Sequence, residues 1–215
     1  MQARKIPKNY LVVTGGFASQ KNDKMRGFES LLEKDHLLLL EFDDSVTSFD
    51  VQPVRIPVPG VRNGYVPDVL VHYKTNSDPP PRSQLIEVKT LEDLERNKQK
   101  YAPKFAAATQ FAQARGWEFV IRDETQIRTS RLSNLKFLRE YRNSTPTEQE
   151  VAQVLRCFTV VNSSSTLLNS LAASEEEKLR WLPVIWSMLL TKQLVTNLEV
   201  PFTGDVPLWL PESKE

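Results

Sequence analysis

The stretch from Tyr65 to Thr90, YVPDVLVHYKTNSDPPPRSQLIEVKT, restricts the possible folds of this chain more than any other feature. VPDVLVHY near its start and QLIEVK near its end have the apolar and alternating patterns of short buried strands. The Pro-rich insert between them, SDPPPRS, cannot join a hydrogen-bonded ladder, so it is predicted to be the connecting loop. The sequence therefore predicts two neighbouring strands of a sheet.

Charged side chains stand at the ends of both predicted strands. Asp68 follows Pro67 on the first strand, and Glu87 and Lys89 lie on the second. Because side chains alternate along a strand, Glu87 and Lys89 project from one face, and strand pairing brings Asp68 to them. Two carboxylates on fixed strands form an oxygen-rich site for Mg²⁺, which can activate water for attack on a phosphodiester. A surface ion pair of little energetic value is the plainer interpretation of the same residues.

The totals of the sequence restrict its class. The chain has 215 residues, of which 40% are hydrophobic and 26% charged, as in an ordinary soluble globular protein. Its net charge of +1 means that DNA binding would need local basic patches or companion subunits. The single cysteine, Cys157, excludes an intramolecular disulfide and is expected to be buried, and two histidines are too few for a Cys/His zinc cluster. With no membrane-spanning run and no signal peptide pattern, we expect a cytoplasmic protein.

The segment before the central stretch mixes helical and strand patterns. Residues 1–25 are polar and basic and are expected to form a flexible arm. Phe28, Leu31 and Leu32 have helical spacing and predict a short helix that carries Glu29, after which LLLLEF is interpreted as a buried strand. Helical position alone makes Glu29 a solvent-facing glutamate. Further strands are predicted over VTSFDVQPVRIPVPGVRNGY, with turn signals at Gly60 and at Asn63–Gly64.

The segment after the central stretch completes an α/β domain. LEDLERNKQKYAPKFAAATQFAQARG predicts a long helix that is kinked or divided at Pro103 and closed by Gly116. WEFVIRDE predicts a strand, and TQIRTSRLSNLKFLREYRN predicts a basic amphipathic segment. This order of elements favours an α/β domain that ends near Asn143.

From Ser144 onward the pattern changes to three helices and two short strands. The first helix is expected to have Pro146 in its first turn and Glu148 as a capping carboxylate, and the strands are expected around a Thr-Gly-Asp turn. This is the outline of a winged helix, a fold that either binds DNA or docks proteins. Few basic residues are present, which favours protein docking, and the tryptophans of the segment are expected in its core: Trp181, Trp186 and Trp209.

Several segments resemble, in order, the TnsA family of transposon-end endonucleases. They are RGFESLLEKDHLLLLEFDDSVTSFDVQP, YVPDVLV, LIEVKT and TQIRTSRLSNLKFL, which together cover about residues 26–142. The resemblance implies an α/β fold with a restriction-endonuclease-like PD-(D/E)xK core at residues 26–143. It also implies an N-terminal basic arm at 1–25 and a winged-helix-like C-terminal domain at 144–215. The Pro-rich loop at 77–83 and the nearly neutral charge depart from the family pattern.

Carried over residue by residue, the resemblance implies four catalytic positions: Glu29, Asp68, Glu87 and Lys89. Glu29 becomes the helical acid of the site, which replaces its solvent-facing interpretation. Asp68 becomes the central metal ligand, Glu87 takes the second strand position, where some family members carry glutamine, and Lys89 becomes the catalytic lysine. Glu29, Asp68, Glu87 and the carbonyl group of Val88 would hold Mg²⁺, for which Mn²⁺ can substitute, and Gln52 is expected close to the site.

The function implied by the resemblance is cleavage of the 5′ strands at the two DNA ends of a transposon. The implied partners are a DDE-type transposase subunit (TnsB), which cuts and joins the 3′ strands, and a AAA+ regulator (TnsC), bound by the C-terminal module. Together they would allow cut-and-paste transposition. Two alternatives remain open: a stand-alone nuclease of the same fold in restriction or repair, and an inert assembly subunit that keeps the fold without the chemistry.

Overall fold

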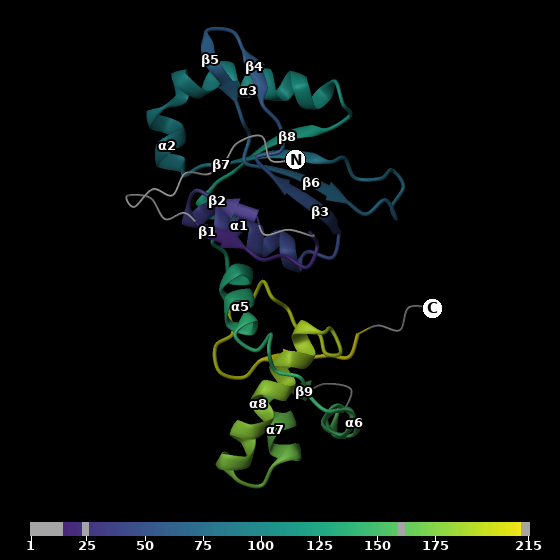
Figure 1. Cartoon of the computed structure of the whole chain (residues 1–215). Coiled ribbons are helices and arrows are strands. Elements are labelled where there is room, and N and C mark those ends of the chain that lie inside the picture. Colours follow the sequence, from purple (N-terminus) through teal and green to yellow (C-terminus); the bar gives the residue numbers. More distant parts are fainter. Residues whose placement is uncertain (1–14, 23–25, 159–161, 212–215) are drawn as a thin grey trace. The chain divides into compact units, whose positions relative to one another are not determined.

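The computed structural model describes residues 15–22, 26–158 and 162–211 of the chain (Figure 1). The chain forms two compact units, Met1–Arg128 and Thr129–Glu215. Most of the predicted basic arm, residues 1–14 and 23–25, lies outside the described residues. Residues 15–22 belong to the folded part, where the side chain of Lys21 donates a hydrogen bond to the carbonyl of Leu40 at 2.9 Å.

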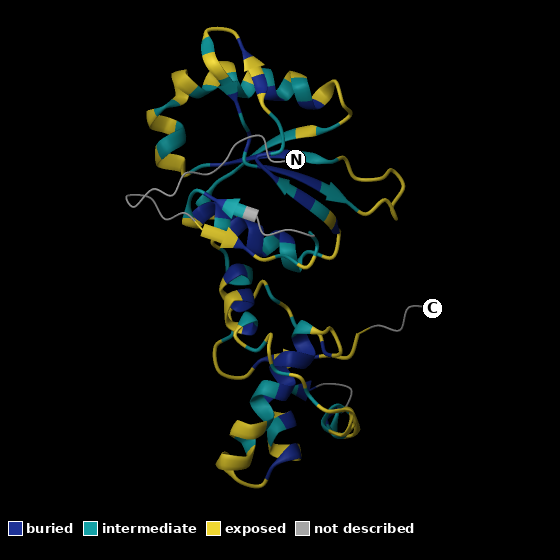
Figure 2. Ribbon diagram, in the orientation of Figure 1, coloured by how far each residue is buried: buried dark blue, intermediate teal, exposed yellow. Residues whose placement is uncertain are grey.

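A four-stranded mixed sheet forms the centre of the first unit, in the order β3-β6-β7-β8. The bounds of its strands are β3 Val46–Val51, β6 Val69–Tyr73, β7 Gln84–Val88 and β8 Glu118–Arg122. β3, β6 and β7 pair antiparallel, and β7 pairs parallel with β8 because helices cross between them. The two strands predicted from the central stretch are therefore β6 and β7, and they are neighbours, with Val69 opposite Ile86. The valine, leucine and isoleucine residues of both strands are buried, as the colouring of Figure 2 indicates.

Helices lie on both sides of this sheet (Figure 1). Their bounds are α1 Leu31–Phe42, α2 Leu91–Arg96, α3 Lys98–Gln113 and α4 Glu124–Ile127. The prediction of a strand over LLLLEF is wrong, because these residues continue α1 and bury Leu37, Leu38 and Leu40. A leucine run suits either a helix or a strand, and packing of α1 against β3 and β7 decides in favour of the helix.

The long helix predicted after the sheet motif is divided, but at Asn97 rather than at Pro103. Asn97 is both the C-cap of α2 and the N-cap of α3, and Pro103 lies inside α3. Gly116 follows α3 with a φ of 71°, which confirms its predicted role at the helix end.

Two small hairpins complete the first unit. β1 Gly15–Phe17 pairs with β2 Arg26–Phe28, and β4 Ile56–Val58 pairs with β5 Val61–Tyr65. The β4–β5 hairpin packs its apolar side chains on α3, where they join Ala108 and Ala112 in one cluster. The prediction of a turn at Asn63–Gly64 is wrong, because both residues lie within β5. Gly64 has a φ of 62°, and a Cβ atom there would lie 2.5 Å from the carbonyl oxygen of Ile56, so only glycine fits this position in the strand.

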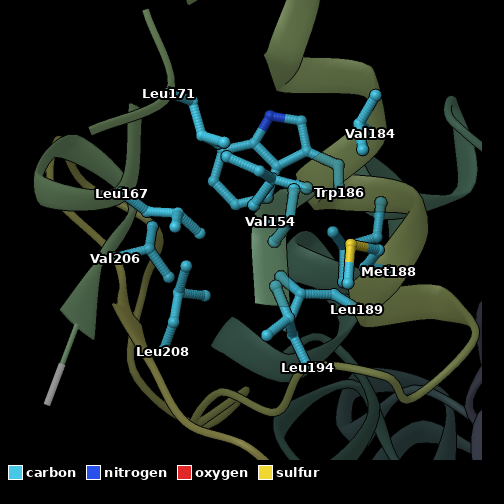
Figure 3. Packing of buried hydrophobic residues seen from close by; sticks show 12 residues of the cluster. Val154, Leu167, Leu171, Val184, Trp186, Met188, Leu189, Leu194, Val206 and Leu208 are labelled. Atoms are coloured by element: carbon cyan, nitrogen blue, oxygen red, sulfur yellow. The ribbon is translucent and has the colours of Figure 1, made fainter. Parts of the chain in front are cut away.

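The second unit is mainly helical. Its helices are α5 Ser130–Arg139, α6 Glu148–Cys157, α7 Ser164–Leu171 and α8 Glu175–Leu190. A short strand between α6 and α7, β9 Asn162–Ser163, pairs antiparallel with β10 Pro207–Leu208. Leucine, valine, methionine and tryptophan side chains fill its core (Figure 3). Within the described residues, no helix of either unit has the length and apolarity needed to cross a bilayer.

The boundary between the units lies earlier than the predicted one near Asn143. α5 belongs to the second unit, because Leu138 is part of its core and Asn134 donates hydrogen bonds of 2.8 Å to the carbonyls of Leu198 and Val200. The basic amphipathic pattern of α5 indicated a helix with one buried face, but not the unit that buries it.

Four local predictions for the second unit need correction. The Thr-Gly-Asp turn is present, with a φ of 75° at Gly204, but the chain on its two sides is joined by an isolated bridge between Val195 and Trp209, and β10 pairs with β9 ahead of α7. α6 is capped by Thr147 in a capping box with Glu150 rather than by Glu148. Trp186 is buried as expected, whereas Trp209 is 42% exposed. Cys157, which was predicted to be buried, is a half-buried free thiol at the edge of the core.

Candidate active site

The backbone of β6 and β7 brings Asp68, Glu87 and Lys89 together, as predicted. Asp68 precedes β6, and its amide donates a 3.0 Å hydrogen bond to the carbonyl of Ile86. Its carboxylate accepts a 2.8 Å hydrogen bond from the amide of Val88. The two strand ends are thus joined by main chain and side chain, which holds the Asp68 carboxylate beside the chain segment that carries Glu87 and Lys89.

The ammonium group of Lys89 lies where three oxygen atoms converge. It is 2.9 Å from Oε1 of Glu87, 3.0 Å from the carbonyl oxygen of Val88 and 3.5 Å from Oδ2 of Asp68. These oxygens belong to three of the groups that the family resemblance implies as metal ligands. In this structure they already surround one positive charge.

Tyr65 is a site residue that sequence reasoning missed. It is the last residue of β5, is 6% exposed, and its hydroxyl donates a 2.6 Å hydrogen bond to Oε2 of Glu87. Lys89 contacts the other oxygen of the same carboxylate, so both oxygens of Glu87 are held. A buried tyrosine normally needs a partner for its hydroxyl, which is the general signal that could have directed attention to Tyr65.

The acid that α1 directs to this cluster is Glu33, not Glu29. Glu33 lies in the first turn of α1 and is 8% exposed. Burial and the nearby Asp68 carboxylate raise its pKa to about 7, while the ammonium of Lys89 acts in the opposite direction. Sequence reasoning missed this residue although Ser30 and Glu33 have the spacing of a capping box, which places the start of the helix at Ser30.

Glu29 lies just before α1 and outside the helix. Its amide donates a 2.8 Å hydrogen bond to the carboxylate of Glu33, and its own carboxylate accepts a 3.0 Å hydrogen bond from the side-chain amide of Gln52. The prediction of Glu29 on a helix is therefore wrong, since Ser30 is the N-cap and α1 begins at Leu31. Its catalytic role stays a prediction.

Gln52 has a left-handed backbone conformation, with a φ of 49°. Its backbone N–H donates a 2.7 Å hydrogen bond to the backbone carbonyl of Asp68. A non-glycine residue in this conformation costs free energy and is found most often near functional sites. The side chain is buried, and its Oε1 atom has no hydrogen-bond partner among the described residues. Gln52 thus lies beside Asp68, as the sequence suggested.

The electrostatics of the cluster show an excess of negative charge. Burial, followed by the charge of Asp68, raises the pKa of Glu87 to about 7, as it does for Glu33. Burial favours the neutral form of Lys89, but the carboxylates of Asp68 and Glu87 outweigh it and raise the pKa of the ammonium above its ordinary value. Several carboxyl groups therefore share one ammonium group, and two of them keep their protons more readily than free glutamate does.

The donor atoms suit a hard, oxygen-seeking divalent cation. Asp68, Glu87 and the Val88 carbonyl supply only oxygens, and an added positive charge would stabilise the ionised form of Glu87, which burial and the Asp68 carboxylate disfavour. In the described part of the chain, no three His, Cys, Asp or Glu side chains are already grouped as a complete ligand set. Mg²⁺ tolerates this, because it uses one or two carboxylates and keeps several waters.

Comparison with protein families gives one result for this region. Residues 43–124 match the family model described as "TnsA-like endonuclease N terminal". The matched segment runs from the end of α1 to the start of α4 and contains Asp68, Glu87 and Lys89. It leaves out Glu29, Glu33 and the whole second unit. No curated protein matches the chain.

Proposed function

We propose that the chain cuts the 5′ strands at the ends of a transposon by metal-dependent hydrolysis, because residues 43–124 match the TnsA-like endonuclease N-terminal family model. It would do so as one subunit of a heteromeric transposase. The observation that carries the proposal is the cluster at the ends of β6 and β7, where the ammonium of Lys89 lies 3.5 Å from the Asp68 carboxylate and 2.9 Å from that of Glu87. This is the charge arrangement that hydrolysis of a phosphodiester requires.

The proposed architecture is a PD-(D/E)xK nuclease core followed by a winged-helix-like module. A mixed sheet with helices on both sides supports the first part, because the Pro67–Asp68 pair precedes β6 and the Glu-Val-Lys sequence ends β7. The order α6, β9, α7, α8, β10 supports the second, since the short strand between the first two helices pairs with the strand that follows the third.

In the proposed mechanism, Asp68, Glu87 and the Val88 carbonyl hold Mg²⁺, with Mn²⁺ as a substitute. Glu33 takes the place of Glu29 as the acid from the helix side, because it is the carboxyl group whose charge is felt by Asp68 and Lys89. When bound, the cation would lower the pKa of a water molecule and stabilise charge on the phosphate.

The remaining chemistry falls to side chains of the chain itself. Lys89 carries a positive charge across the physiological pH range and can stabilise the negative charge that develops on the phosphate in the transition state. Tyr65 donates its hydroxyl hydrogen to Glu87, which favours the ionised form of this carboxylate and fixes its orientation. The site thus combines a charged donor with an oriented carboxylate.

The proposed partners are the DNA of the transposon ends, a DDE-type transposase that cuts the 3′ strands, and a AAA+ regulator. A protein-docking role of the second unit is supported by its exposed apolar side chains, among them Val195 and Trp209, which are paired in an isolated β-bridge. Exposed apolar residues that lie together are typical of interaction surfaces. The net charge of +1 also agrees with partners that supply part of the grip on DNA.

The first test is calorimetric titration with Mn²⁺ and Mg²⁺, with and without transposon-end DNA. We expect wild type to bind the cation and Asp68→Ala to lose this binding, because the change removes the proposed central metal ligand. Glu92→Ala is the matched control, since Glu92 is an exposed acid of the same unit whose side chain is paired only with Arg96. Absence of binding by wild type in the presence of DNA would contradict the proposal and favour the inert assembly subunit.

Strand-specific cleavage in the reconstituted partner complex is the second measurement. Asp68→Ala and Lys89→Ala should each abolish 5′-strand cleavage, by a factor of about 1,000 or more, while the partner transposase continues to cut the 3′ strands. Undiminished 5′ cleavage by either variant would refute the assignment. Cleavage of both strands by the chain alone would favour the restriction or repair nuclease instead.

A further inference from the structure

The β4–β5 hairpin has two chemically distinct faces. Ile56, Val58 and Tyr65 are buried against α3 and are part of one hydrophobic cluster. The opposite face is exposed and carries two arginines, Arg55 and Arg62. Hydrophobic packing on α3 accounts for the first face, but it does not account for arginines at two exposed positions of the second.

The exposed face is hollowed and basic. A hollow of about 1040 Å³ is lined by residues of both strands, with Arg55 and Arg62 among them. No acidic residue occurs between Asp50 and Asp68, so the hairpin has no carboxylate of its own to neutralise these charges. Arg55 donates to the backbone carbonyl of Asn63, and Arg62 has no hydrogen bond or ion pair with any described residue.

The hairpin is anchored to the catalytic cluster. Tyr65, its last residue, donates the 2.6 Å hydrogen bond to Glu87. Arg62 is three residues earlier on the same strand, or about 10 Å along a chain that rises roughly 3.3 Å per residue. One DNA strand carries a phosphate every 3.4 Å of helix axis, so this distance corresponds to about three nucleotides. The arginines therefore lie within reach of phosphates that flank one bound at the cluster.

The catalytic cluster itself cannot attract DNA. Its carboxyl groups, Asp68 and Glu87 with Glu33 nearby, outnumber the single ammonium of Lys89. A polyanion placed there needs positive charge from nearby residues. The hairpin is a basic segment that is directly hydrogen-bonded to this cluster through Tyr65.

The hairpin is unsuited to the other common use of an exposed hairpin, the recruitment of an additional strand. Pro57 lies within β4 and Pro59 follows it, and neither residue has a backbone N–H to offer to a partner strand. Arginine side chains, in contrast, are well suited to bind phosphate oxygens in a bidentate manner.

We propose that the β4–β5 hairpin is a DNA-backbone-binding arm in which Arg55 and Arg62 bind phosphates next to the scissile one. The inference rests on the proposed nuclease function and adds to it a second contact region for the same substrate. Because these contacts are made to phosphates, they position the DNA and raise affinity without reading its sequence. Tyr65 connects this arm to Glu87, so DNA bound by the arm lies next to the cluster.

The test is fluorescence anisotropy of a labelled DNA duplex with the full chain in metal-free buffer, at several salt concentrations between about 50 and 200 mM. Arg62→Ala should weaken binding roughly tenfold and lower the slope of log K against log salt by about 0.9, the value for one phosphate contact. The double variant with Arg55→Ala and Arg62→Ala should lower the salt slope by about twice this amount. Arg62→Lys keeps the positive charge, so it should retain most of the wild-type slope.

Arg82→Ala is the matched control, because Arg82 is an exposed arginine of the same unit in the Pro-rich loop between β6 and β7. An equal loss of affinity in Arg82→Ala would show that the hairpin has no special role and would overturn the inference. So would unchanged affinity and salt slope in the Arg55 and Arg62 variants.

Calorimetric titration of the same variants with Mn²⁺ separates this inference from the proposed function. All of the Arg55 and Arg62 variants should bind Mn²⁺ as wild type does, because the arginines are not part of the metal site. If wild type binds metal and DNA and the variants lose neither, the nuclease proposal stands and the arm is refuted. If wild type binds no DNA even at the lowest salt, the substrate itself is wrong, and both proposals fail.

Discussion

The catalytic cluster of the first unit and the core of the second unit show two opposite uses of buried space. In the cluster, Glu33 and Glu87 are almost completely buried and carry ionisable groups. In the core, Val154, Ile185 and Met188 have no exposed surface, and Ser187, a buried polar residue beside them, is neutral and hydrogen-bonded to the carbonyl of Ser144. The first region keeps groups that resist burial, whereas the second consists of groups that favour it.

The difference shows where function conflicts with stability in this chain. Burying a carboxylate costs free energy unless it is paired, and the single ammonium of Lys89 cannot pair fully with several carboxyl groups. Groups with strongly raised pKa values in one place are characteristic of functional sites. An apolar core such as that of the second unit has no such conflict. We therefore expect the two regions to respond differently to truncation, to neutralisation of charge and to pH.

The largest expected effect on stability is in the second unit. Ile185→Ala removes a fully buried side chain from the core of α8 and should destabilise this unit by about 3 kcal/mol. Hydrogen exchange resolved by peptide should show faster exchange in α6, α7 and α8, with Mn²⁺ binding by the first unit unchanged. Leu179→Ala is the control, since Leu179 is 66% exposed on the same helix. Equal effects of the two changes would contradict the assigned core.

The second prediction concerns the two glutamates near the start of α1. Glu33→Gln should lower 5′-strand cleavage by roughly 100-fold, because it removes a charge that acts on Asp68 and Lys89. It should not destabilise the first unit, since burial disfavours the ionised form of this group. Glu29→Gln should have a smaller effect, because Glu29 lies outside α1 and is hydrogen-bonded to Gln52. A larger loss in Glu29→Gln would restore the original assignment of the helical acid.

The smallest expected effect is a pH dependence that distinguishes the two units. The pKa values of Glu33 and Glu87 are raised to about 7 in the folded chain from an ordinary 4.5. The folded state therefore binds more protons than the unfolded state between these values, and the stability of the metal-free first unit should fall as pH rises from about 4.5 to 7. We expect a total change of roughly 1–2 kcal/mol, because side chains and water rearrange around each carboxyl group when it ionises and so lower the cost of its burial.

Hydrogen exchange at pH 5 and pH 7.5, corrected for the intrinsic exchange rate, measures this change in each unit. The core of the second unit should show no comparable trend, since its buried side chains do not ionise in this range. Glu33→Gln should remove part of the trend in the first unit. Stability of the first unit that rises with pH over the same range would show that these carboxyl groups are ionised at little cost, and would contradict the excess of negative charge.

The chain's sequence by itself determined the placement of the central charges. Strands over VPDVLVHY and QLIEVK, a Pro-rich loop between them, and period-two alternation suffice to bring Asp68, Glu87 and Lys89 to neighbouring strand ends. These are local patterns, and antiparallel pairing of two strands joined by one loop needs no information from the rest of the chain.

Only the tertiary structure decided which other groups join them. The leucine run after Glu29 is compatible with a strand or a helix, and its packing on β3 and β7 as α1 brings Glu33 near enough for Asp68 and Lys89 to affect its pKa. The partner of the Tyr65 hydroxyl depends on how the hairpin packs on α3, and the unit to which α5 belongs depends on contacts of Asn134 with residues far along the chain. Periodicity shows that a residue has a buried face, but the neighbour that covers this face is a long-range property of the fold.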